Sequence, residues 1–169
     1  MRFGNLAREV GMRYRRLVFV VLLIFQCMFS AGSCLADEHS LITTVSSNKT
    51  FEDTLQHLRW QFGTYNLTVT SAMNYGDILS GSSPDIQKAA VIEFMNQQWI
   101  EDIIQSNIQM AIWSPMRILV FVSDEGSVMI SYVSPLTAAE LSGFSDPRAL
   151  DLMKTVDRKL AALVRNAAR

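Results

Sequence analysis

The sequence predicts an α+β domain in which a mostly antiparallel sheet carries two main helices on one face. The expected order is a strand, a long helix, three or four strands with a short helix among them, and a long C-terminal helix. Residues 114–135 contain two apolar runs separated by an acidic turn that ends in Gly126, which is the pattern of an antiparallel hairpin. Two other segments, residues 51–62 and 149–163, repeat apolar residues at helical spacing. A length of 169 residues, of which 49% are hydrophobic and 18% charged, fits one globular domain.

Residues 1–36 are typical of a secretory signal peptide, so the predicted domain occupies residues 37–169. Five arginines precede an apolar run at residues 17–29, which at roughly 13 residues is too short to span a membrane comfortably. Cys34 and Ala36 suit the −3 and −1 positions of a cleavage site. Two alternatives stay open, an uncleaved membrane anchor and a lipoprotein acylated on Cys34. If the signal peptide is cleaved, we expect a periplasmic or secreted domain that is not attached to the membrane.

Removal of residues 1–36 changes the formal net charge from −1 to −5, because this segment contains five arginines and one glutamate. The basic residues that remain are scattered, whereas nucleic-acid binding depends on clustered Lys and Arg that neutralise phosphates. Cys27 and Cys34 leave with the same segment, so the mature domain has no disulfide, cysteine nucleophile or thiolate metal site. The sequence therefore predicts no nucleic-acid partner and indicates no cofactor.

The first part of the domain is expected to be a strand, a helix and a second strand. Residues 41–47 are rich in β-branched side chains, which favours a strand. Thr50 is a good N-cap with Asp53 three residues later, and the apolar stripe that follows predicts a helix to about Gly63. Residues 67–75 have the composition of the second strand.

The middle of the chain is expected to be a loop, a third strand and a short helix. Residues 76–85 are rich in Gly and Ser, and a loop of this length is often functional or mobile. Residues 89–95 are apolar and predict the strand. The isoleucines that predict the short helix by their spacing are Ile100, Ile103, Ile104 and Ile108.

A three-residue hairpin loop that ends in Gly126 fixes the register of the two strands around it, because glycine readily takes the left-handed conformation. Pairing Ser123 with Ser127 gives one face that is entirely apolar and that we expect the helices to cover. This covered face carries Ile118, Val120, Val122, Val128, Ile130 and Tyr132. The opposite face carries Arg117, Leu119, Phe121, Met129 and Ser131.

The chain is expected to close with a second long helix. Asp146 is a favourable N-cap and Pro147 suits the first helical position. Arg165 and Arg169 near the end complement the helix dipole. The stripe that this helix should bury consists of Ala149, Met153, Val156, Leu160 and Leu163.

The hairpin segment resembles the signature of the family called domain of unknown function 302, in which a proline and an arginine open an apolar strand before an acidic-Gly turn. The resemblance extends from about Thr43 to Val164 and includes Phe94 at the end of the third strand. Of the Gly-Asn-Pro turn that the family has after this phenylalanine, only Asn96 matches. The resemblance implies a β-α-β(4)-α arrangement similar to the TATA-binding-protein fold, assembly as a homodimer, and no established reaction. The residues that match the signature are Pro115, Arg117, Gly126, Ser131, Tyr132 and Pro135.

Arg117 is the strongest single candidate for a site residue. On a sheet face beside Leu119 and Phe121, its guanidinium could clamp a carboxylate or a sulfur oxyanion with two hydrogen bonds. The structural alternative is an ion pair with an acid on a neighbouring element, or hydrogen bonds to loop carbonyls. The candidate ligand-binding residues are Arg117, Leu119, Phe121, Met129 and Ser131.

The other candidate groups favour neither a hydrolase nor a metal site. His57 lies on the polar side of the first helix and His39 in a polar tail, and the sequence has no Ser-His-acid motif or Gly-rich phosphate loop. Met110, Trp113 and Met116 are three residues apart, and thioethers are ligands for Cu(I). The proline within this segment and the strand after it predict an extended chain, in which methionines more often fill a core.

We therefore expect an exported, non-enzymatic domain that binds a small ligand or a partner chain through the sheet face that carries Arg117. An apolar sheet face without helices over it is either buried in a homodimer or lines a pocket. Two alternatives remain: an enzyme for a small substrate with Arg117 as the anion clamp, and a copper-handling protein that uses methionines.

Overall fold

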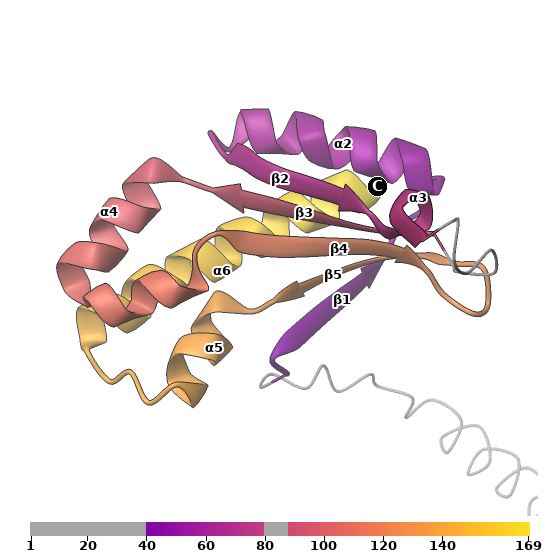
Figure 1. The fold of residues 1–169 in the computed structure, drawn as a ribbon. Coiled ribbons are helices and arrows are strands. Elements are labelled where there is room, and N and C mark those ends of the chain that lie inside the picture. Colours follow the sequence, from indigo (N-terminus) through magenta and orange to yellow (C-terminus); the bar gives the residue numbers. More distant parts are fainter. Residues whose placement is uncertain (1–39, 80–87) are drawn as a thin grey trace, which may run out of the picture. The chain divides into compact units, whose positions relative to one another are not determined.

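The computed structural model describes residues 40–79 and 88–169, which form one antiparallel sheet with helices packed against it (Figure 1). The strands follow the order β1-β5-β4-β3-β2, and each neighbouring pair is antiparallel. The predicted α+β class is thereby confirmed. The strands are β1 (Ile42–Ser46), β2 (Thr68–Asn74), β3 (Ala89–Met95), β4 (Met116–Val122) and β5 (Val128–Val133).

Two long helices pack against the sheet, as predicted. Helix α2 (Phe51–Thr64) begins after Thr50, whose hydroxyl oxygen accepts a hydrogen bond from the backbone N–H of Asp53. Helix α6 (Pro147–Ala168) begins after Asp146, whose carboxylate accepts hydrogen bonds from first-turn N–H groups. The stripe predicted for α6 is buried; it consists of Ala149, Met153, Val156, Leu160 and Leu163.

The segment expected to be a loop begins with a helix instead. Residues 76–79 belong to α3 (Tyr75–Leu79), and the side chain of Asn74 accepts a hydrogen bond from the N–H of Gly76. An asparagine that binds the backbone in this way stabilises a turn at the end of β2. The rest of the predicted loop, the predicted signal segment, both cysteines and His39 lie outside the described residues.

The isoleucine-rich helix is shorter than predicted. Helix α4 (Gln97–Ser106) ends before Asn107, and a 3₁₀ helix, η1 (Ile108–Trp113), begins after it. Asn107 separates the two because its N–H donates to the carbonyl of Ile103 while its side chain accepts from the N–H of Gln109. Asparagine is well suited to such a junction because its short amide can replace a backbone partner.

Helix α5 (Pro135–Leu141) was not predicted from the sequence. It begins after Ser134, whose hydroxyl accepts a hydrogen bond from the N–H of Thr137. None of the helices among residues 40–79 and 88–169 combines the length and apolar character needed to cross a membrane.

The hairpin between β4 and β5 has the predicted register. The N–H of Ser123 donates to the carbonyl of Ser127 at 2.8 Å, and Gly126 has φ = 80°, in the left-handed region. The pairs Val122 with Val128, Val120 with Ile130, and Ile118 with Tyr132 follow from it.

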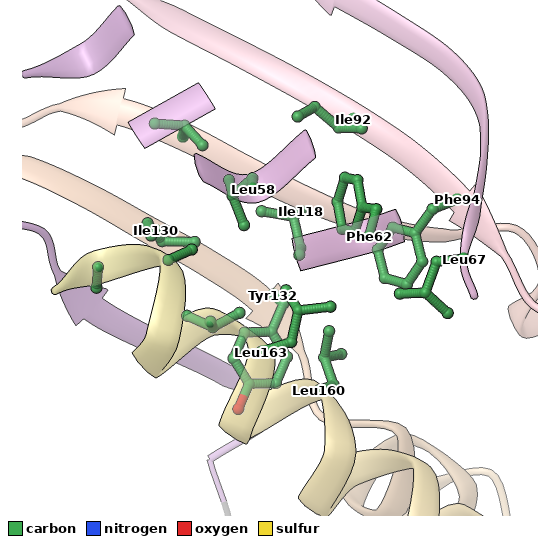
Figure 2. Close-up of a cluster of buried hydrophobic side chains, with 14 of the residues drawn as sticks. Leu58, Phe62, Leu67, Ile92, Phe94, Ile118, Ile130, Tyr132, Leu160 and Leu163 are labelled. Atoms are coloured by element: carbon green, nitrogen blue, oxygen red, sulfur yellow. The ribbon is translucent and has the colours of Figure 1, made fainter. Parts of the chain in front are cut away.

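The core lies between the sheet and helices α2 and α6. Ile118, Val120 and Ile130 are fully buried on the sheet face that points toward these helices, which we call the inner face. Figure 2 shows Leu160 and Leu163 of α6 beside Tyr132, and Phe62 of α2 beside Phe94 of β3. The predicted placement of two main helices on one face of the sheet is therefore confirmed.

Burial beneath α6 raises the pKa of the Tyr132 hydroxyl above its usual value of 10.0, while a hydrogen bond with Thr43 acts in the opposite direction. Folding then favours the neutral phenol, so its contribution is fully present below about pH 10 and is lost as the pH rises. We expect Tyr132→Phe to flatten this alkaline decline in the free energy of unfolding by up to about 1.4 kcal/mol per pH unit. Urea unfolding of both proteins at pH 9, 10 and 11 measures the two slopes. Equal slopes would contradict the assignment to Tyr132.

Candidate functional site

The five residues singled out from the sequence lie on the sheet face opposite the helices, which we call the outer face. Their shared orientation follows from strand alternation and from the register, which pairs Leu119 with Ser131 and Phe121 with Met129. Leu119, Phe121 and Met129 are half-buried by their sheet neighbours. The structure thus brings these residues together at the centre of the sheet.

Apolar side chains continue across the outer face to both edges of the sheet. Ile42 of β1 pairs with Val133 of β5, and their side chains are 56% and 38% exposed. Val91 of β3 pairs with Leu119, and Met73 of the edge strand β2 pairs with Val91 and is 37% exposed. The outer face therefore carries apolar side chains on all five strands, and the polar residues among them include Thr44, Ser131, Glu93 and Arg117.

Arg117 is held on this face by an acid from the next strand. It lies opposite Glu93 in the register of β3 and β4, and its Nε donates to Glu93 Oε1 at 2.7 Å. The side chain of Arg117 is 68% exposed and that of Glu93 is 17% exposed. A pair this exposed contributes at most about 1 kcal/mol to stability. Its main effect is to fix the direction of the guanidinium.

Ser131 is the one polar residue among the five that is buried. Its hydroxyl lies 2.7 Å from the hydroxyl oxygen of Thr44, its partner on β1. A hydroxyl used in this cross-strand hydrogen bond stabilises the edge strand. Ser131 therefore helps to hold β1 to β5.

A cleft of about 240 Å³ opens at the end of the sheet where β4 begins. Its walls come from α4, η1, α5 and α6 as well as from the sheet, so its lining residues are far apart in sequence. Arg117 is the one charged residue that lines it. The apolar lining includes Trp99, Ile103, Trp113, Met116, Pro135 and Met153.

The methionines considered as copper ligands occupy separate packing environments. Met110 is fully buried in a second apolar cluster that includes Ile103 and Met153. Met116 packs against the main core instead. Among the described residues, no three His, Cys, Asp or Glu side chains lie close enough together to hold a metal ion.

The enzyme alternative requires a titratable group beside Arg117. His57 is exposed on α2, which packs on the inner face, so it lies on the far side of the sheet from Arg117. Glu93 is the carboxylate within hydrogen-bonding distance of Arg117, and it already accepts a hydrogen bond from the guanidinium. This contact is the ion pair that the structural interpretation of Arg117 anticipated.

The sequence of residues 42–167 matches the family described as Domain of unknown function DUF302. The fold is similar to that of a solved structure described as an uncharacterized conserved protein DUF302 from Bacillus stearothermophilus, with a TM-score of 0.69 and 17% sequence identity. The similarity covers 76% of this chain and 98% of that one. No curated protein matches the sequence. At this level of identity the structural similarity concerns the fold.

Proposed function

The chain belongs to the family of the domain of unknown function DUF302, and we propose that it works as an exported, non-enzymatic binding domain whose outer face associates with a second copy of the chain. The observation that carries the proposal is the set of partly exposed apolar side chains on the outer face, which no helix covers. Large groups of exposed apolar side chains on a folded monomer usually mark an interaction site. The homodimer implied by the family resemblance agrees with this assignment.

The charges on the outer face support a second copy as the partner. Arg117 and Glu93 form one cation and one anion near each other on this face. In a two-fold symmetric interface the same patch meets itself, and a patch whose one cation and one anion are already paired within the chain brings no net charge to that interface. An outer face with one charge of each sign therefore does not repel its copy, whereas a face with a single sign of charge would.

Export is the second part of the proposal. It rests on the basic segment, the apolar run at residues 17–29 and the small residues before Asp37. The intact mass of the processed chain tests it. A chain that begins at Asp37 supports export and release by cleavage before Asp37. An acylated Cys34 would instead show export with a lipid anchor, and an uncut N-terminus contradicts cleavage.

Sedimentation equilibrium of the processed chain tests association through the outer face. We expect a dimer for the unchanged protein and at least a tenfold weaker association, about 1.4 kcal/mol or more, for Phe121→Glu, because a carboxylate at the centre of an apolar interface would be desolvated without a partner. Trp60→Glu is the matched control, since Trp60 is 68% exposed on α2, away from the outer face. A monomeric unchanged protein, or equal weakening by both variants, would contradict the proposal.

A further inference from the structure

The cleft at the start of β4 adjoins the outer face and shares Arg117 and Val133 with it, but most of its walls come from the helices. Trp99 of α4, Trp113 of η1 and Met153 of α6 bring two indoles and a thioether to its walls. Pro135 of α5 closes the lining from another direction. Side chains from four separate elements thus enclose an apolar space, which is the usual composition of a small-molecule site.

The mouth of the cleft is accessible and partly aromatic. Trp113 is 36% exposed although it lines the cleft, and its neighbour Ile112, also in the lining, is 80% exposed. Trp99 is only 7% exposed, and Lys159 Nζ lies 5.6 Å from the centre of its ring. Trp99 is therefore fixed in the wall, whereas Trp113 presents an indole surface to an incoming molecule.

The polar groups of the cleft are few and have one sign of charge. Arg117 is its one charged lining residue, Ser114 contributes the one side-chain hydroxyl, and the lining contains no acid. Arg117 bonds Glu93 through Nε, and within the described part of the chain no other side chain is paired with this guanidinium. Its Nη groups, fixed in direction by Glu93, are the donors that a carboxylate would need.

We propose that this cleft binds a small carboxylate that carries a single ring or a short branched apolar group. The apolar part would lie against Trp113 and the α4 and α6 walls, and the carboxylate would bond Arg117 at the rim. The volume of about 240 Å³ sets the size, because an apolar cavity of about 150 Å³ already accommodates benzene. The single positive charge in an otherwise apolar lining sets the charge of the ligand.

Calorimetric titration of the processed chain with phenylacetate tests the proposal, with phenylacetamide as the uncharged probe of the same shape. We expect phenylacetate to bind at least ten times more tightly than phenylacetamide. Arg117→Gln should remove this preference by weakening phenylacetate alone, while Trp113→Ala should weaken both probes. Arg148→Gln is the control for loss of one positive charge, because Arg148 is exposed on α6 and is not in the lining.

Quenching of tryptophan fluorescence locates the binding, since Trp99 and Trp113 line the cleft and Trp60 does not. The signal should shrink in Trp113→Ala and persist in Trp60→Phe. Failure of both probes to bind at millimolar concentration would overturn the proposal. Equal weakening of both probes by Arg117→Gln would also overturn it, because it would show a structural role for the arginine. Phe121 is outside the lining, so Phe121→Glu should bind phenylacetate unchanged, which separates this test from the test of dimerisation.

Discussion

Phe94→Ala is expected to lower the free energy of unfolding by about 3–5 kcal/mol, which is the usual cost of removing a fully buried phenylalanine. Phe94 is 0% exposed at the end of β3 and stacks on Phe62 of α2, with ring centroids 5.0 Å apart and an interplanar angle of 25°. The substitution removes apolar contacts with both the sheet and the helix. A cavity would remain, because regular elements on both sides limit how far the core can collapse.

Urea unfolding followed by circular dichroism measures this loss, and Phe94→Leu provides a milder variant if Phe94→Ala does not fold. A double-mutant cycle with Phe62→Ala gives the contribution of the stacked pair, for which we expect a coupling of about 0.5–1.5 kcal/mol. A loss below about 1 kcal/mol for Phe94→Ala would show that this part of the core is not packed as described.

The strands and the two long helices could be predicted because their signals are local. Alternation over β4 and β5, together with Gly126 in a left-handed turn, determines the register without knowledge of any other element. Thr50 and Asp146 mark the starts of α2 and α6 by capping chemistry that acts within four residues. Such features depend little on the rest of the fold.

The short helices were missed or misplaced for a physical reason. Helix α5 has seven residues, too few to show a repeated apolar stripe, although Ser134 and Pro135 are a capping pair that could have indicated it. At the junction of α4 and η1, the isoleucine spacing continued past Asn107 while the hydrogen bonding changed. Periodicity alone does not report that change.

The candidate site likewise has a part that local sequence patterns predict and a part that they do not. The outer face could be predicted, because it follows from alternation within one hairpin. Glu93 as the partner of Arg117 could not, since it depends on β3 lying beside β4, which no local pattern specifies. The cleft could not be predicted for the same reason, because Trp99, Trp113 and Met153 come together only through tertiary packing. Trp113 was noted in the sequence only for its spacing from two methionines.

Ile118→Ala should destabilise the protein by about 2–5 kcal/mol, whereas Leu119→Ala should cost less than about 1.5 kcal/mol. The two side chains are isomers on adjacent positions of β4, so the comparison isolates the face of the sheet from the size of the group. Ile118 is 0% exposed beneath the helices, and Leu119 is half-buried on the outer face. A hairpin shifted by one residue would exchange the two environments and reverse the order of the two effects.

Urea unfolding of each variant gives the two values, and repeating it at two protein concentrations separates folding from association. Association through the outer face would add a concentration-dependent loss for Leu119→Ala that Ile118→Ala does not show, because only Leu119 lies on that face. If the loss for Leu119→Ala equalled that for Ile118→Ala and did not vary with concentration, Leu119 would be part of the monomer core. The outer face would then not be a free surface, and the proposed dimer would lose its basis.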